Sequence, residues 1–154
     1  MLEYMQIGLV ILLGIYLLFR NTRINASPLS QIRTVIRASQ YAPYEKYIIN
    51  QMNLESGYLT NTLSQPPIYN PFSMGAVSIR KTTQIDTYSN PNIDDGMPFG
   101  VYEDYASATQ DFIYYLDNIR MPMDLTCQEY NAYINSKGYA VDPKYEEKLN
   151  NMCR

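Results

Sequence analysis

The chain has 154 residues, of which 46% are hydrophobic, a formal net charge of -3 and no histidine. This length fits one compact domain with its own core, and an acidic balance without a run of Lys or Arg argues against a nucleic-acid partner. The absence of histidine excludes Ser-His-Asp triads, Cys-His nucleophile pairs and histidine zinc sites. Catalysis would therefore depend on carboxylates, tyrosines or lysines, and the sequence indicates no metal and no organic cofactor.

An apolar segment opens the chain. Glu3 is the only charged residue in residues 2–19. As a helix such a segment is roughly 27 Å long, enough to cross a thin hydrocarbon core. Basic residues follow it instead of preceding it, which favours an uncleaved anchor over a signal peptide. We expect a transmembrane helix over residues 1–20 and a polar linker over 21–27; the alternative is a buried core helix.

The remaining domain, residues 28–154, is expected to begin with helices. Ser27 and the proline after it are typical of a helix N-cap and first helical position, and apolar residues follow at helical spacing. A second helix is predicted over residues 42–57 and would end at a glycine, which places Glu55 on its last turn. A shorter helical piece is predicted over residues 58–64.

A small β lobe is expected next. Residues 77–88 are rich in β-branched side chains and predict the strands of a hairpin, with residues 89–98 as its loop or exit. Helical periodicity returns over residues 104–117 and again from about 125 to 137, and a last helix is expected with Asp142 as its N-cap. This order predicts an α+β fold.

The two cysteines, Cys127 and Cys153, lack CxxC spacing and do not indicate a metal site. They can pair in an oxidising compartment or remain thiols, and the sequence leaves both open. A bond between them is expected to be dispensable for folding because the core is large enough without it.

Residues 51–75 carry the motif on which a function can be argued. They read QMNLESGYLTNTLSQPPIYNPFSMG, with Glu55 in a Glu-Ser-Gly-Tyr string and Asn70 opening an Asn-Pro-Phe turn. The segment resembles the glucosaminidase family of peptidoglycan hydrolases, in which a helix ends in Glu-Ser-Gly-aromatic and a short helix and an Asn-x-Phe-x-x-Gly-like turn follow. Two later blocks, Pro98–Leu116 and Asn135–Leu149, are similar to further segments of that family. Lytic transglycosylases share Glu-Ser-Gly but usually continue with Gly-Leu-Met-Gln, which does not follow here.

The resemblance implies a lysozyme-like, mainly helical α+β domain with a small β-hairpin lobe. It also implies hydrolysis of the β-1,4 bond between N-acetylglucosamine and N-acetylmuramic acid, with Glu55 as general acid. The residue type fits this chemistry, because burial and the negative end of a helix both raise the pKa of a carboxyl group. Without the motif, an acidic residue at this place would be an ordinary solvated side chain.

The resemblance also suggests partners for Glu55. Asp86 is the best match to the second carboxylate, although a glutamate near Gln84 is more usual. Asp86 would direct a water, or the substrate's own N-acetyl group would assist, or Asp86 is a turn residue. Tyr139 matches a family tyrosine that would orient the N-acetyl group or stabilise charge, with core packing as the alternative. Candidate sugar-binding residues, for which packing or turn roles are the alternative, are Tyr58, Asn70, Phe72 and Tyr102.

Other functions and locations stay open. The chain could be a muramidase or lytic transglycosylase, or a catalytically weak structural or assembly protein of a membrane-containing virion. Arginines follow the expected span, so the positive-inside rule places the domain in the cytoplasm, whereas a wall hydrolase must reach the wall. We expect a single-pass protein of a virion membrane or of the bacterial envelope, with peptidoglycan and the membrane as its partners. The small anchored architecture resembles lytic proteins carried by phage particles.

Overall fold

The computed structural model describes residues 26–89 and 98–154, and the chain divides into two compact units, residues 1–31 and 32–154. The expected anchor over residues 1–20 lies outside the described residues. Within the two described ranges, no helix combines the length and the apolar character needed to span a membrane. Helix α2 (Pro28–Arg37) begins as predicted, and the Ser30 amide donates to the hydroxyl of Ser27 at 3.3 Å.

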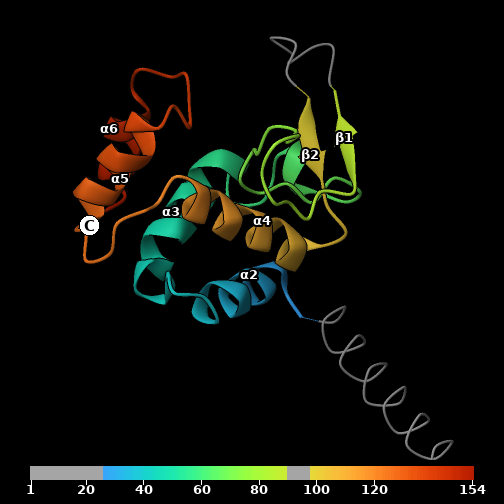
Figure 1. The fold of residues 1–154 in the computed structure, drawn as a ribbon, viewed down its shortest axis with the longest axis horizontal. Coiled ribbons are helices and arrows are strands. Elements are labelled where there is room, and N and C mark those ends of the chain that lie inside the picture. The colour runs from blue at the N-terminus through green and yellow to red at the C-terminus, as the bar shows by residue number, and fades with distance from the viewer. Residues whose placement is uncertain (1–25, 90–97) are drawn as a thin grey trace, which may run out of the picture. The chain divides into compact units, whose positions relative to one another are not determined.

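Helices form most of the second unit (Figure 1). The predicted helix over residues 42–57 is confirmed as a 3-10 turn η1 (Ala42–Tyr44) followed by α3 (Glu45–Ser56), with Gly57 as C-cap. The piece predicted over residues 58–64 forms only the short 3-10 helix η2 (Thr62–Ser64). The later helices are α4 (Tyr105–Asn118), α5 (Cys127–Ser136) and α6 (Tyr145–Asn150).

Side-chain caps account for where two of these helices begin. The Asp104 carboxylate accepts from the Ser107 amide at 2.7 Å and caps α4, and Thr126 and Glu129 form a reciprocal capping box at the start of α5. The prediction that Asp142 caps the last helix is wrong. Its carboxylate accepts from the Lys144 amide at 2.9 Å in the preceding turn, so α6 begins only at Tyr145.

The sheet is smaller than predicted. Strands β1 (Asp86–Tyr88) and β2 (Phe99–Val101) pair antiparallel, with Asp86 opposite Val101. The prediction of strand structure is confirmed for residues 86–88 and wrong for residues 77–85. Residues 77–85 form a loop in which several polar groups bond to α4; for example, the Thr83 hydroxyl donates to the Ser107 carbonyl at 2.7 Å. At the end of this loop the Ile85 amide bonds to β2, at the Val101 carbonyl. The mainly helical α+β class is nevertheless confirmed.

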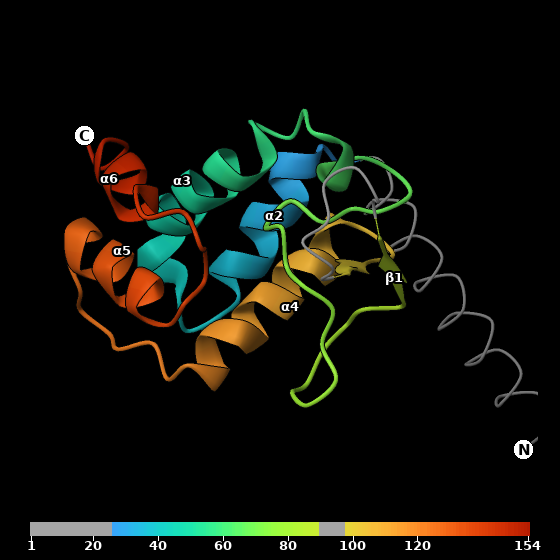
Figure 2. The ribbon, with the colours of Figure 1, turned by 90° about the horizontal axis from the view of Figure 1, so that it is seen from above.

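Helices α3 and α4 lie between the α5/α6 pair and the two-stranded sheet in both views (Figures 1 and 2). The core contains aliphatic and aromatic side chains, and the rings of Phe72 and Phe112 stack at 4.3 Å between centroids. A disulfide joins Cys127 at the start of α5 to Cys153 beyond α6, with 5.8 Å between the two Cα atoms. The structure therefore decides the open question of the cysteines in favour of pairing.

Candidate active site

Glu55 occupies the last turn of α3, and the residues that follow it end the helix. Gly57 adopts a left-handed conformation with φ of 56°, which favours glycine because it has no Cβ. The buried Ser56 hydroxyl donates to the Met52 carbonyl at 2.6 Å and accepts from the Leu59 amide at 2.8 Å. In the Glu-Ser-Gly string, the serine and glycine therefore turn the chain and leave the glutamate at the helix end.

The Glu55 carboxyl group is half-buried, and burial raises its pKa above the ordinary value for glutamate. Interactions with the hydroxyls of Tyr145 and Ser73 favour the charged form and lower the pKa, but they do not cancel the effect of burial. No ion pair found within residues 26–89 and 98–154 includes Glu55. A carboxyl group in this environment keeps its proton closer to neutral pH, as a general acid requires.

Two tyrosines from the segment around α6 interact with this carboxyl group. The Tyr139 hydroxyl donates to the Phe72 carbonyl, and burial followed by the charge of Glu55 raises its pKa well above the usual value. Tyr145 is buried at the start of α6, and burial and Glu55 raise its pKa too. The two rings lie 5.9 Å apart. Both phenols stay neutral at physiological pH and can donate a hydrogen bond.

Tyr139 is thus close enough to Glu55 for the charge of the carboxyl group to affect its pKa, and so is Tyr145, which the sequence interpretation missed. The catalytic role of Tyr139 stays a prediction. Tyr145 lies in the same family-like block as Tyr139 and shares an apolar helix face with Leu149. Any aromatic residue of the core can show that spacing. Helical spacing alone therefore does not distinguish a tyrosine of the active site from one that only packs in the core.

Three of the expected sugar-binding residues are internal. Asn70 and Phe72 are 0% exposed and Tyr102 is 1% exposed. The Asn70 amide donates to the Met74 carbonyl at 2.8 Å, and the Tyr102 hydroxyl donates to Asp111 at 2.8 Å. A side chain without accessible surface does not contact a sugar. The expectation of substrate contact is therefore corrected to a supporting role for all three.

Tyr58 differs from these three residues. It follows Gly57, has a positive φ of 60°, and its side chain is 69% exposed next to the end of α3. Of the four aromatic and amide residues expected to bind sugar, it is the one with surface available for stacking.

Asp86 and Gln84 lie on the segment from which the second carboxylate was expected. Asp86 is exposed at the start of β1, where its carboxylate accepts from the Thr87 amide at 2.8 Å. Gln84, at the place where a glutamate would be more usual, points inward and donates to the Gly75 carbonyl at 3.0 Å and to the Tyr102 hydroxyl at 3.1 Å. The Gln84 side chain is therefore used in holding the lobe together.

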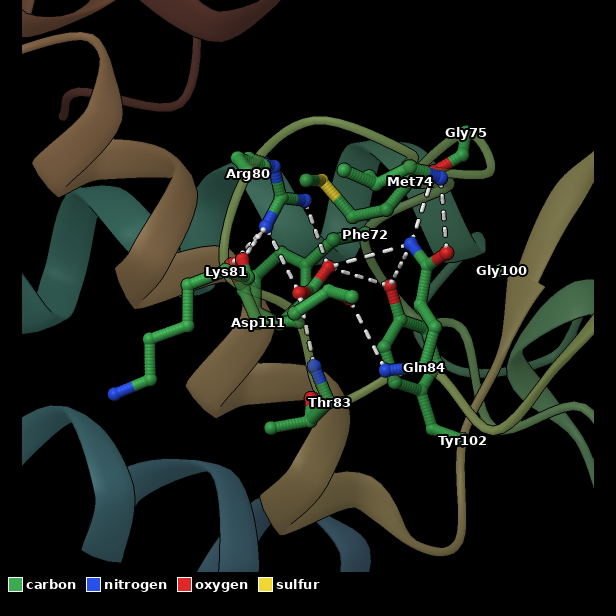
Figure 3. A network of polar contacts seen from close by, with 12 residues as sticks. Phe72, Met74, Gly75, Arg80, Lys81, Thr83, Gln84, Gly100, Tyr102 and Asp111 are labelled. Carbon is green, nitrogen blue, oxygen red and sulfur yellow. Dashed lines mark hydrogen bonds and ion pairs between the residues drawn. The ribbon is translucent and has the colours of Figure 1, made fainter.

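A buried charge cluster anchors this lobe to α4 (Figure 3). The guanidinium of Arg80 contacts both carboxylate oxygens of Asp111, at 2.9 and 2.8 Å, and the side chains are 9% and 0% exposed. Tyr102 and the Thr83 amide also donate to Asp111. Sequence reasoning missed this pair. The available signal was an acidic residue on the otherwise apolar face of α4, between Ala108 and Phe112.

Comparison with known proteins supports the family that the sequence motifs resemble. The glucosaminidase family, described as mannosyl-glycoprotein endo-beta-N-acetylglucosaminidase, matches residues 34–154. The chain belongs to the glucosaminidase family. The predicted resemblance is thereby confirmed, and with it the prediction that the chain is a glycoside hydrolase. Residues 34–154 include Glu55, Asp86, Tyr139 and the disulfide.

Solved structures with the same fold include three bacterial proteins. The catalytic domain of the autolysin Auto from Listeria monocytogenes is 22% identical, with a TM-score of 0.54 over 87% of this chain and 82% of that one. A peptidoglycan hydrolase from Sphingomonas sp. A1 is 20% identical, with a TM-score of 0.58 over 80% and 81%. A C-terminally truncated glycoside hydrolase domain of FlgJ from Salmonella typhimurium is 24% identical, with a TM-score of 0.53 over 80% and 88%. No curated protein sequence matches the chain.

Proposed function

We propose that this chain hydrolyses the glycan strands of bacterial peptidoglycan, at the β-1,4 bond between N-acetylglucosamine and N-acetylmuramic acid, with Glu55 as general acid. The observation that carries the proposal is a half-buried carboxyl group whose pKa is raised by burial, in a family of glycoside hydrolases. The structural relatives named above include an autolysin and a peptidoglycan hydrolase, which supports peptidoglycan as the substrate class.

In this mechanism Glu55 donates its proton to the oxygen of the departing sugar as the glycosidic bond breaks. The neutral Tyr139 hydroxyl is near enough for its pKa to be affected by the Glu55 charge. Its single proton is donated to the Phe72 carbonyl, so it would have to leave that carbonyl to donate to the N-acetyl carbonyl or to developing negative charge. The exposed ring of Tyr58 supplies a stacking surface beside the helix end.

The second catalytic role falls to Asp86 or to the substrate. Asp86 is the only acidic residue in residues 75–89, and it is exposed. If it positions the attacking water, Asp86→Asn lowers the rate about as much as loss of Glu55. If the N-acetyl group of the sugar assists instead, Asp86→Asn retains most activity, and a substrate with free amino groups in place of the N-acetyl groups is not cut.

Mass analysis of digested cell wall tests the proposal. The reducing-end sugar of the fragments identifies the bond: N-acetylglucosamine at the new end supports the proposed cleavage. N-acetylmuramic acid at that end indicates a muramidase, and an anhydro sugar indicates a lytic transglycosylase. No fragments from a folded protein would favour the virion assembly role, for which the inward-turned Gln84 is the relevant observation.

We further propose that residues 1–20 anchor the enzyme in a membrane and that the domain faces an oxidising compartment, either outside the bacterial plasma membrane or on a virion membrane. The support is the apolar sequence of this segment and the disulfide of the domain, because disulfides persist in oxidising compartments. Fractionation tests this: the full chain should remain with membranes after a high-salt wash, and a variant lacking residues 1–26 should be released.

A further inference from the structure

Tyr145 has a buried hydroxyl group without a regular hydrogen bond. The side chain is 4% exposed, and its Oη has no partner in hydrogen-bond geometry among the described residues. Leaving a buried hydroxyl unpaired is unfavourable. The same hydroxyl interacts with the carboxyl group of Glu55 strongly enough to affect the pKa of both groups. The hydroxyl of Tyr145 and the carboxyl group of Glu55 are therefore neighbours, without the geometry of a regular hydrogen bond.

Helix α3 presents a second polar group to Tyr145. Gln51 lies four residues before Glu55, so the two side chains share one face of the helix. Gln51 is 0% exposed, its Oε1 accepts from the Tyr130 hydroxyl at 3.0 Å, and its Nε2 has no partner in regular geometry among the described residues. The side chain of Gln51 also interacts with Tyr145. Tyr145 thus links the Tyr130–Gln51 pair in the core to the carboxyl group at the helix end.

The position of Tyr145 depends on what holds α6. This helix has six residues, too few to be stable without tertiary contacts. The Asn131 amide of α5 donates to Asn150 at 2.9 Å and contacts the Cys153 sulfur at 3.3 Å. The Asn50 amide of α3 donates to the Met152 carbonyl at 2.7 Å. These contacts surround the disulfide that ties Cys153 to α5.

We propose that Tyr145 is a positioning residue for Glu55 and that the Cys127–Cys153 disulfide holds it in place, so that reduction of this bond lowers glycosidase activity. This rests on the proposed function, in which Glu55 is the general acid. Reduction by a dithiol such as dithiothreitol breaks the S–S bond and leaves two thiols; the dithiol supplies two electrons and two protons and becomes a cyclic disulfide. Cys153 is partly exposed, so the bond is accessible to such a reductant.

The positioning role of Tyr145 is tested by measuring the Glu55 pKa by NMR on the full chain in mild detergent. The protein carries labelled glutamate, and the Glu55→Gln variant assigns the Glu55 signal. The groups that face Glu55 are the hydroxyls of Ser73, Tyr139 and Tyr145. The Tyr145 hydroxyl lowers the Glu55 pKa, so Tyr145→Phe should raise it and move the basic limb of the pH-activity profile upward. Activity should fall about ten- to hundredfold, the range for a hydrogen bond to a charged group.

Tyr115→Phe is the matched control. It also removes a buried hydroxyl without a regular partner among the described residues, but the groups that affect the Tyr115 pKa do not include Glu55. It should leave the Glu55 pKa and the activity unchanged. Equal effects of Tyr115→Phe and Tyr145→Phe would overturn the positioning role.

Reduction tests the disulfide part. Reduction of the wild type should shift the Glu55 pKa in the same direction as the Tyr145→Phe substitution does. Reduction of the Tyr145→Phe variant should lower its activity by less than a further twofold. Unchanged activity and pKa after verified reduction would overturn the proposal, and so would loss of the whole fold by circular dichroism, because the bond would then support the domain and not Tyr145 in particular. A wild type that cuts no wall but shows these pKa shifts would refute the proposed function and the predicted loss of activity, and would support only the link between the disulfide, Tyr145 and Glu55.

Discussion

Asp111 and Glu55 are two buried carboxyl groups in one domain, and their environments act in opposite directions. Asp111 is 0% exposed, and burial alone would raise its pKa. Hydrogen bonds from Arg80, Thr82 and Tyr102 outweigh burial and lower the pKa below the usual value for aspartate. Glu55 is less deeply buried, its carboxyl group interacts with neutral hydroxyls among the described residues, and its pKa is raised.

The hydrogen-bonding and charged groups around a carboxyl group, more than its depth of burial, therefore decide its protonation in this fold. Asp111 is held charged by a guanidinium and is used to anchor the lobe between α3 and the sheet to α4. Glu55 has no cation to hold its charge among the described residues, so it can give up and recover a proton.

Glu55→Gln should have the largest effect. It keeps the size of the side chain and removes the proton, so wall digestion should slow by about 10² to 10⁴, the usual value of general acid catalysis. The rate is measured by release of labelled fragments at fixed pH. The control is Glu103→Gln, an exposed glutamate before α4, which should digest wall at the wild-type rate. Full activity of Glu55→Gln would contradict the assignment.

Asp111→Asn should mainly affect stability. It leaves the Arg80 charge buried and unpaired, so the free energy of unfolding should fall by about 3–5 kcal/mol, measured by urea unfolding. The control is Asp142→Asn, which breaks the exposed pair with Lys148 and should change stability much less. Because the folded-state pKa of Asp111 is lowered, its contribution is present above the unfolded pKa and is lost as pH falls through the folded pKa. The difference between variant and wild type should therefore shrink in acid.

Gly100→Ala tests how tightly the lobe beside Asp111 is packed. A Cβ at residue 100 would lie 2.5 Å from the amide of Gln84, which is fixed by bonds to Gly75 and Tyr102. Overpacking of this kind costs about 1–3 kcal/mol in unfolding free energy. Adding Gln84→Ala should remove the clash, so the double variant should be more stable than the sum of the two single changes predicts.

The smallest effect concerns the stability of Glu55→Gln. A carboxyl group whose folded-state pKa is raised destabilises the fold when it is ionised. Compared with the Glu55→Gln variant, wild type should lose stability as pH rises from the unfolded pKa to the folded pKa of Glu55. The melting temperature of Glu55→Gln should therefore equal that of wild type in acid and exceed it slightly at neutral pH. A lower melting temperature at neutral pH would mean that the charge of Glu55 is stabilised by partners, as in Asp111.

The local structure follows from the sequence alone. The end of α3 follows from Ser56 and Gly57, and the starts of α2, α4 and α5 follow from residues whose side chains bond the first turn. Glu55 could be placed at a helix end for the same reason. The family-like blocks indicated the family and put Tyr139 near Glu55 as an expectation.

Which polar residues are available for chemistry depends on contacts between elements that are far apart in the sequence. Asn70, Phe72 and Tyr102 share a motif or block with exposed residues, yet contacts from other elements bury them completely. Arg80 meets Asp111 across 31 residues of sequence, and Tyr145 reaches Glu55 from a helix fixed by a distant disulfide. Burial and pairing set pKa and access, and both depend on neighbours that the chain brings together only when it folds.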